Sequence, residues 1–324
     1  MVQALQKAGV SVTPMLCEAA NMPSWLQAQL GICWDRLTIS CTPPFGLNRI
    51  PGRHWLLSMT EGSRLPDGWS DIINESGVER VIVPCQHNAE VFAAAGVQCP
   101  VSVIPGGTDP DEFPLRRDAR RHTGQYRPYK FLALADRGAR KGWVEVWQAF
   151  YEAFGPPEKT PDVRLIIKSR PDGNNMLDII AQAENPDPRI NIIMDDMNMC
   201  ALYSSVDCFA IPSRSEGFGM PHREAAMCGV PVITQRYSGM DDGHTHEWAM
   251  VLKPGTFDAI PAHFDHIAGE WMKCDVKDLA WHMSYCYEYP DIQRDDAYER
   301  ARWLRMNQTW NHSAKKILDL ISGD

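Results

Sequence analysis

The stretch from Ile211 to Gly239, IPSRSEGFGMPHREAAMCGVPVITQRYSG, most constrains how this chain can fold. The apolar run at residues 206–211 predicts a short buried strand. After the glycine turn, Pro221 to Cys228 predicts a helix, because a proline suits the first helical turn and Gly229 suits the position just past the end. Val230 to Thr234 predicts the next strand. A strand, a glycine turn and a helix N-terminus in succession favour anion binding, since free amides and the helix dipole point at one spot.

Two glutamates in this stretch indicate more than a phosphate site. Glu216 lies on the loop at the carboxyl end of the strand, and Glu224 lies near the start of the helix. Both can face the crevice where ligands of open α/β sheets bind. A carboxylate repels phosphate unless it holds hydroxyl groups, which sugars and ribose offer in pairs. For Glu224 alone, an acidic first turn that complements the helix dipole is the simpler interpretation, whereas the whole stretch favours a ligand site.

The segment PSRSEGFGMPHREAAMCGVPVI resembles the donor-binding signature of retaining GT-B glycosyltransferases, in particular glycosyltransferase family four. That signature reads P-S-x-x-E-G-F-G-x-P-x-x-E-A-x-A-x-G-x-P-V-I, and the match is long and ungapped, with Met227 in place of a small alanine. The resemblance implies an α/β chain of the GT-B fold, in which two Rossmann-like doubly wound domains face a cleft. It also implies that Glu216 contacts the donor sugar and that Glu224 binds the ribose hydroxyls. By the same resemblance, the donor is contacted by the turn residues Gly217, Phe218, Gly219 and Met220.

A second loop carries positive charge. Residues 130–135 predict a strand, and the loop DRGARKG, residues 136–142, leads from it into a helical pattern. Arg137 and Lys141 lie at this helix start, where two fixed cations could neutralise a diphosphate leaving group; a solvated basic turn is the plain alternative. An arginine and a Lys-Gly pair after this strand resemble the family's diphosphate clamp. The spacing is four residues where many members have five, so Arg140 is an alternative to Arg137.

The length and composition limit the kinds of protein that this chain can be. With 324 residues, the chain can bury a large core and is expected to form two domains. A net charge of −9 argues against broad binding to nucleic acid or anionic lipid. The ten cysteines include no C-x-x-C pair, so we expect buried thiols such as Cys208 and Cys228 rather than a zinc ribbon. No signal peptide and no apolar run long enough to span a membrane are evident, which favours a cytoplasmic setting.

Strands and helices alternate through the second half, which predicts a parallel doubly wound sheet. We expect residues 1–120 to form an acceptor-side Rossmann-like domain and residues 121–324 a nucleotide-sugar donor-binding domain. The last helix, within Arg294 to Ile321, should pack back on the first domain, as in GT-B proteins. The family normally begins with a strand and a glycine-rich loop. Here Met1 to Gly9 predicts a helix and Val10 to Thr13 a strand, so we expect either a shortened N-terminal domain or a chain whose start is not the natural one. The further predicted strands are residues 37–40, 55–59, 81–83, 163–168 and 190–193.

Three further residues are candidates for the site. Glu61, in the loop TEGSRLP, could face the acceptor from across the cleft, and a carboxylate in water is an equally good interpretation. Lys168, at a strand end, could approach the donor or could be solvated. Met194 could approach the nucleotide base through its backbone, by resemblance to the family. The segment IPGGTD, residues 104–109, resembles the family's hinge segment I-P-N-G-V-D, with Gly106 in place of asparagine.

The resemblance implies a retaining hexosyltransferase that moves a hexose from a UDP-sugar or GDP-sugar to a saccharide, lipid or other small acceptor. It implies no metal and no further cofactor, because Lys141, Arg137 and the helix dipole neutralise the leaving group. It also implies a front-face mechanism in which Glu216 positions the sugar. Phosphorylases and sugar-nucleotide epimerases share the architecture, but no pyridoxal phosphate site is evident. The alternative from another class is a nucleotide-sugar binding module with little turnover, because the N-terminal glycine loop is absent.

Overall fold

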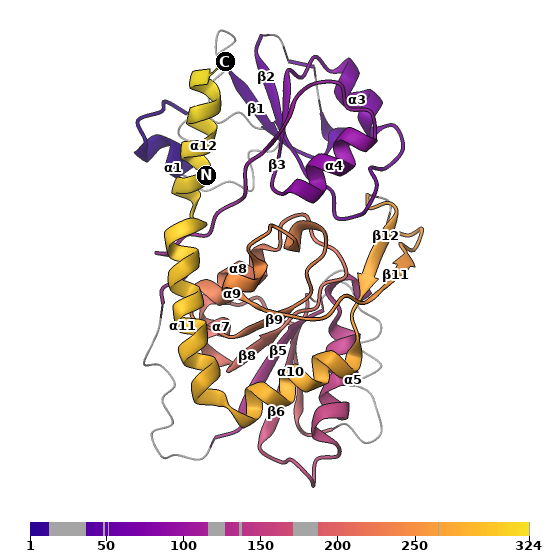
Figure 1. Cartoon of the computed structure of the whole chain (residues 1–324), viewed down its shortest axis with the longest axis vertical. Helices are drawn as coiled ribbons and strands as arrows, with labels where there is room; N and C mark the ends of the chain where they lie inside the picture. Colours follow the sequence, from indigo (N-terminus) through magenta and orange to yellow (C-terminus); the bar gives the residue numbers. More distant parts are fainter. Residues whose placement is uncertain are drawn as a thin grey trace.

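The computed structural model describes residues 1–12, 37–47, 49–50, 52–115, 127–135, 138–170, 187–264 and 266–323. Within these residues two parallel sheets lie one above the other, and the C-terminal helices run along one side of both (Figure 1). Helices cover the faces of each sheet, as the alternation of strands and helices predicts.

The N-terminal sheet contains four parallel strands in their chain order. They are β1 (Thr38–Cys41), β2 (His54–Leu57), β3 (Arg80–Val83) and β4 (Val101–Val103). Successive side chains of a strand point to opposite faces. Val81 and Val83 accordingly pack with α3 (Trp69–Glu75) and α4 (Gln86–Ala94). Ile82 packs on the other face, with α1 (Val2–Lys7) and α12 (Trp310–Gly323).

The C-terminal sheet has the strand order β10-β9-β8-β5-β6-β7, and all neighbours run parallel. The strands are β5 (Tyr129–Leu134), β6 (Val163–Lys168), β7 (Ile190–Ile193), β8 (Cys208–Ala210), β9 (Val232–Thr234) and β10 (Met250–Val251). From β5 the chain adds two strands on one side and then returns to the other side. The order therefore reverses between β5 and β8, and ligands of open α/β sheets bind outside the carboxyl ends at such a point.

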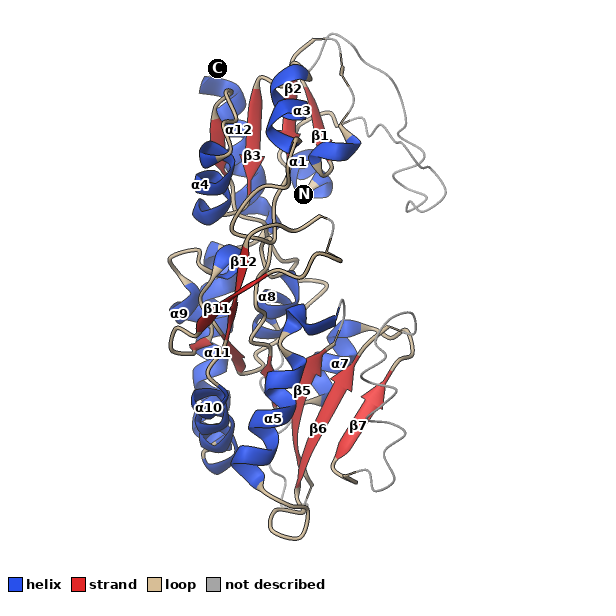
Figure 2. Cartoon of the chain, turned by 90° about the vertical axis from the view of Figure 1, so that its right-hand side faces the viewer, coloured by secondary structure: helices blue, strands red, loops and turns tan. Residues whose placement is uncertain are grey.

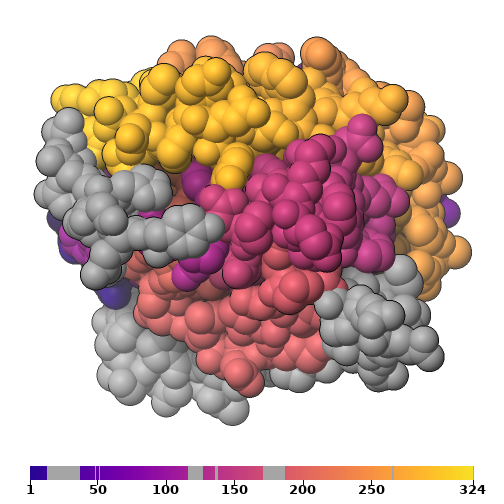
Figure 3. Space-filling view, turned by 90° about the horizontal axis from the view of Figure 1, so that it is seen from below, coloured from indigo at the N-terminus to yellow at the C-terminus, as the bar shows by residue number. Residues whose placement is uncertain are grey.

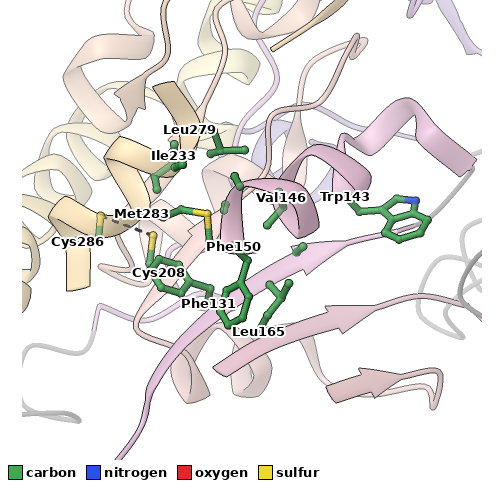
Figure 4. Packing of buried hydrophobic residues seen from close by; sticks show 14 of the residues in the cluster. Phe131, Trp143, Val146, Phe150, Leu165, Cys208, Ile233, Leu279, Met283 and Cys286 are labelled. Atoms are coloured by element: carbon green, nitrogen blue, oxygen red, sulfur yellow. Dashed lines mark hydrogen bonds between the residues drawn. The ribbon is translucent and has the colours of Figure 1, made fainter. Parts of the chain in front are cut away.

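Both faces of this second sheet are buried. On one face, Phe131 and Leu165 pack against α5 (Trp143–Phe154) and α10 (Val276–Glu288) (Figure 4). On the other face, Leu132 and Ile166 pack with α7 (Met199–Ser205), α8 (Met220–Met227), α9 (Thr245–Trp248) and α11 (Pro290–Asn307). Seen from below, the yellow and orange C-terminal helices lie against the magenta segment that contains α5 (Figure 3).

The chain crosses between the two sheets where α11 ends and α12 begins. The helical run breaks at Gln308 and Thr309. The carbonyl of Gln308 accepts a hydrogen bond from the amide of Thr108 at 3.1 Å, and Thr108 and Thr309 form a parallel bridge. One turn later, Ser313 donates to the carbonyl of Pro105 at 2.7 Å. These bonds fasten the start of α12 to the N-terminal domain.

A hairpin makes a second connection on the opposite side of the molecule from α11 (Figures 1 and 2). Its strands, β11 (Thr256–Ala259) and β12 (Glu270–Lys273), pair antiparallel. In the segment between them, the carbonyl of Ala268 accepts from the amide of Arg64 at 3.2 Å. Phe45, in the 3-10 helix η2 (Pro44–Gly46), stacks on His266 with ring centroids 4.6 Å apart. The hairpin thus contacts two loops of the N-terminal domain.

Apart from Val10 to Thr13, the predicted strands in both halves are confirmed to within a few residues. Three predictions need correction or lie outside the described residues. The helix expected from Arg294 to Ile321 is two helices, because the crossing ties Gln308 and Thr309 to the N-terminal domain. Residues 10–12 are irregular rather than a strand, and Thr13 lies outside the described residues. The boundary between residues 120 and 121 also lies outside them. Helix α10 and the hairpin were not predicted.

Two expectations from the composition concern the cysteines and membrane-spanning segments. All eight cysteines in the described ranges are free thiols, and Cys208 and Cys228 are buried, as expected. Among the same residues, no helix has the length and apolar composition needed to cross a membrane.

Gly107 lies against the backbone of Thr309 and Trp310, where an added Cβ would clash. We predict that Gly107→Ala lowers the free energy of unfolding by about 2 kcal/mol, because backbone cannot yield as a flexible side chain can. The matched control is Gly323→Ala, since a Cβ added there would have nothing within 4 Å beyond its own stretch of helix. Urea unfolding of both variants tests this; an unchanged midpoint for Gly107→Ala would contradict the close packing of the crossing.

Candidate functional site

The loops that follow β5 and β8 meet where the strand order reverses. The first loop contains the 3-10 helix η3 (Gly138–Lys141) and ends at Gly142, whose φ of 71° lies in the left-handed region. A side chain at Gly142 would clash with the carbonyl of Pro212 in the second loop. The amide of Arg214 also donates to the carbonyl of Arg140 at 2.7 Å. The two loops are therefore pressed together, and side chains from both reach one spot.

Glu216 is buried at this spot between two cations. Nζ of Lys141 donates to its Oε1 at 2.6 Å, and Nη1 of Arg140 donates to its Oε2 at 3.2 Å. Burial disfavours the charged carboxylate, but the charges of Lys141 and Arg140 outweigh burial and hold the pKa of Glu216 well below its usual range. Glu216 is therefore ionised, and both of its oxygens accept hydrogen bonds from cations.

Arg140 also connects the two domains. Its guanidinium lies 3.3 Å from Oε1 of Glu61, in the loop after β2. The Glu61 side chain is 26% exposed and the Arg140 side chain is 3% exposed, so the pair lies at the edge of the buried charges. Together with Glu216 and Lys141, this pair makes a set of two carboxylates and two cations whose formal charges cancel.

The structure describes one of the two arginines considered from the sequence. Arg137 lies outside the described residues. Arg140, the alternative to it, lies beside Lys141, and the side chains of both contact Glu216. The structure thus brings together Lys141, Arg140, Glu216 and Glu61. The roles of these residues in binding or catalysis stay predictions.

Three successive carbonyls of the signature turn, at residues 216–218, are each held by a different part of the chain. The first accepts from the amide of Gly239 at 2.8 Å. The second accepts from Nδ2 of Asn88, in α4 of the N-terminal domain, at 3.4 Å. The third accepts from the guanidinium of Arg223, in α8. In a trans peptide the N–H points opposite to the carbonyl, so the next three amides, of residues 217–219, face away from these partners.

The amides of Gly217, Phe218 and Gly219 have no hydrogen-bond acceptor among the described residues, although all three residues are buried. Buried amides are nearly always hydrogen-bonded. Successive amides without an acceptor, followed by the positive end of a helix, form a concave site for an anion or a strongly polar oxygen. Met220 is the first residue of that helix, α8. These are the four turn residues that the sequence predicts to contact the donor.

The N-terminal domain packs closely on this turn. A side chain at Gly217 would clash with Met59, and a Cβ at Gly106 would lie 2.8 Å from the ring of Phe218. Gly106 stands where the hinge segment that it resembles has asparagine, and a larger residue here would displace Phe218. Gly219, with φ of 77°, turns the chain into α8, and a side chain there would clash with Met240.

Glu224 lies one turn into α8 and is partly buried. The hydroxyl of Tyr203 donates to its Oε2 at 3.3 Å. Burial raises the pKa of Glu224 to about 7, with a smaller contribution from the charge of Glu112, whereas Tyr203 and the charge of Lys141 act in the opposite direction. Unlike Glu216, Glu224 is therefore divided between its protonated and ionised forms near neutral pH.

Lys168 and Met194 lie at the carboxyl ends of the neighbouring strands β6 and β7. The carbonyl of Ile193 accepts from the amide of Ser169 at 2.9 Å, which keeps the two strand ends together. Nζ of Lys168 donates to the carbonyl of Ser169 at 2.6 Å, and the side chain of Met194 packs against the core. In the described part of the chain, neither side chain contacts the carboxylates of the site, so their proposed donor contacts stay predictions.

Sequence reasoning missed Asn88 and Arg223, which hold two carbonyls of the turn. Arg223 is fully buried, pairs with Asp242 at 2.5 Å and lies over the ring of Phe218, 3.9 Å from its centroid. For Arg223 the sequence did contain a signal. This arginine lies three residues before Ala226, and therefore on the apolar face of the predicted helix. Asn88 has no such signal, because its role depends on contact between the two domains.

Within the described residues, no group of three or more His, Cys, Asp or Glu side chains could hold a metal ion. The positive charges that lie beside Glu216 are those of Lys141 and Arg140.

Comparison with known proteins shows what this chain is similar to. A family model described as glycosyl transferases group 1 matches residues 117–268. A D-inositol 3-phosphate glycosyltransferase of Mycobacterium sp. (strain KMS) is 26% identical over 183 residues, which cover 53% of this chain and 40% of that protein. The O-antigen chain mannosyltransferase B of Escherichia coli is 37% identical over 68 residues, which cover 21% of this chain and 18% of that protein. The chain thus spans less than half the length of these two curated relatives.

Solved structures confirm the GT-B fold that the sequence predicts. Sucrose-phosphate synthase from Thermosynechococcus elongatus superposes with a TM-score of 0.63 at 17% identity, over 85% of this chain and 68% of that one. The Anabaena protein HepE in complex with UDP and glucose superposes with a TM-score of 0.64 at 16% identity, over 84% of this chain and 72% of that one. At these identities the similarity concerns the fold.

The pKa of Glu224 makes a prediction about stability. A carboxyl group whose pKa is raised on folding stabilises the fold below its unfolded-state pKa, and this contribution is lost as the pH rises through about 7. Between pH 5.5 and pH 8, we expect the wild type to lose about 1–2 kcal/mol more unfolding free energy than Glu224→Gln. Urea titrations at both pH values measure the difference. Glu288→Gln, at an exposed position, is the control and should follow the wild type. Parallel pH profiles for the wild type and Glu224→Gln would refute the prediction.

Proposed function

We propose that this chain, which belongs to the glycosyl transferases group 1 family, transfers a hexose from a nucleoside diphosphate sugar to an acceptor with retention of anomeric configuration. One observation carries the proposal: a buried glutamate with two cations lies beside three amides that have no acceptor in the described chain, at the reversal point of a parallel sheet. Anionic and hydroxyl groups must be recognised together in a nucleotide sugar, and this arrangement offers donors and an acceptor side by side.

The leaving diphosphate is the group that needs positive charge. Lys141 and Arg140 supply it, and the amides of residues 217–219 add oriented partial charges at the N-terminus of α8. The four side-chain charges of the resting site cancel, so a diphosphate must share the two cations with Glu216 and Glu61. We infer that these cations and amides neutralise the leaving group without a metal ion.

Glu216 acts on the sugar as a positioning group. Its low pKa and its two cation partners make it a weak base and a weak nucleophile, because its charge is already stabilised. This supports a front-face reaction in which the leaving phosphate takes the proton of the acceptor. The carboxylate of Glu216 accepts hydrogen bonds from sugar hydroxyls and fixes the anomeric carbon.

Glu224 binds the ribose in this proposal. Tyr203 holds its Oε2, and an ionised carboxylate has capacity for further donors. The acceptor approaches from the N-terminal domain, where Glu61 lies next to Arg140.

Two structures with this fold were solved with a nucleotide and a sugar. They are the Anabaena protein HepE with UDP and glucose, and the pneumococcal O-GlcNAc transferase GtfA with UDP and GlcNAc.

We predict that calorimetry with UDP, GDP and ADP shows tight binding of one of them, and that two variants change binding differently. Lys141→Met should weaken the nucleoside diphosphate about tenfold or more and leave the free nucleoside unchanged, because a charge-assisted contact to phosphate is lost. Glu224→Gln should weaken both ligands, because the ribose contact is common to them. Lys159→Met, at an exposed lysine, is the matched control.

Transfer is then measured with the matching sugar donor, and the product anomer is read by nuclear magnetic resonance. Transfer with retention supports the whole proposal. Tight donor binding without transfer or hydrolysis would favour the nucleotide-sugar binding module instead. If none of the three nucleotides binds, the proposed function is wrong.

A further inference from the structure

Ser238 has an unusual backbone conformation next to the site. It begins the short 3-10 helix η4 (Ser238–Met240), which follows β9, and it is 1% exposed. Its φ is 52°, and it is the one residue other than glycine with a positive φ in the described ranges. A side chain in this left-handed region costs free energy that glycine would not, and such residues persist where the surrounding structure holds them.

The hydroxyl of Ser238 contacts both polar backbone groups of Glu216. It accepts a hydrogen bond from the amide of Glu216 at 2.8 Å and donates to the carbonyl of Glu216 at 3.0 Å. The next residue, Gly239, donates its own amide to the same carbonyl at 2.8 Å. The backbone of Glu216 is thus held on one side by two consecutive residues of η4.

The helix η4 is itself fixed in place. A side chain at Gly239 would clash with the backbone of Gly217, so η4 lies directly against the turn. On one side of η4, the hydroxyl of Tyr237 donates to the carbonyl of Glu270 in the hairpin, at 3.0 Å. On the other side, Thr245 donates to the carbonyl of Met240. A fixed support transmits its position to what it holds, in this case the peptide of Glu216.

We propose that Ser238 is a positioning residue for transfer, an inference that rests on the proposed function of Glu216. The hydroxyl holds the peptide so that the carboxylate of Glu216 stays on Lys141 and Arg140. The same bond turns the carbonyl of Glu216 toward η4, so the amide of Gly217 points the other way. One hydroxyl thereby sets the direction of a carboxylate and of the first amide of the site, and the left-handed backbone is what brings that hydroxyl to Glu216.

Two substitutions separate the hydroxyl from the backbone strain. Ser238→Gly removes the hydroxyl and the strain, whereas Ser238→Ala removes the hydroxyl and keeps the strain. We expect both variants to lower kcat about tenfold, with a smaller change in the donor KM, because two hydrogen bonds to Glu216 are lost. We expect Ser238→Gly to melt above Ser238→Ala, because both variants lose the hydroxyl and only Ser238→Ala keeps the strained backbone. An equal loss of kcat in two variants of different stability is a result that a merely structural role would not produce.

A second measurement does not depend on activity. The amide of Glu216 should exchange with solvent about tenfold faster in Ser238→Gly than in the wild type, while the amide of Ile166 in β6 exchanges as before. Unchanged exchange at Glu216, or a kcat of Ser238→Gly within twofold of the wild type, would overturn the role of Ser238. Faster exchange at Glu216 in Ser238→Gly, together with a wild-type protein that binds no nucleotide, would support the hold of Ser238 on Glu216 and reject the proposed function.

Discussion

The ion pair between Glu216 and Lys141 is the interaction on which the rest of the site depends. An ionised carboxylate that is almost fully buried is tolerated only with close cationic partners, because removing one partner leaves an uncompensated charge in a medium of low polarity. That requirement fixes the loops after β5 and β8 against each other. The loops can approach this closely because Gly142 has no side chain to clash with the carbonyl of Pro212. The reversal of strand order between β5 and β8 is what places these loops side by side.

The turn beside this ion pair is held by hydrogen bonds from separate parts of the fold. Asn88 belongs to the N-terminal domain, Arg223 belongs to α8, and Gly239 follows β9. Arg223 is in turn bonded to Gln308, where the chain crosses between the domains. The direction of three amides is thus a property of the assembled molecule, and a site prepared in advance needs little reorganisation when charge develops.

How much the sequence predicts depends on how local each interaction is. The strand, turn and helix around Glu216 follow from neighbouring residues, and they are confirmed. Arg140 could be named only as an alternative, because its contact with Glu61 joins residues far apart in the chain. The break at Thr309 carries neither glycine nor proline; its cause is the bridge to Thr108. The strand Thr256–Ala259 is exposed along its whole length, so no alternation of burial marks it.

The cancelling charges of Glu61, Glu216, Arg140 and Lys141 have a consequence for the surroundings of the site. Opposite charges packed at hydrogen-bonding distance form a compact multipole, whose potential falls off much faster with distance than that of a single ion. Mobile salt ions, which screen over about 8 Å at physiological ionic strength, therefore have little to act on while the four groups stay together. These four side chains therefore contribute almost nothing to the long-range attraction of anions. They act on a ligand only when it is in contact with them.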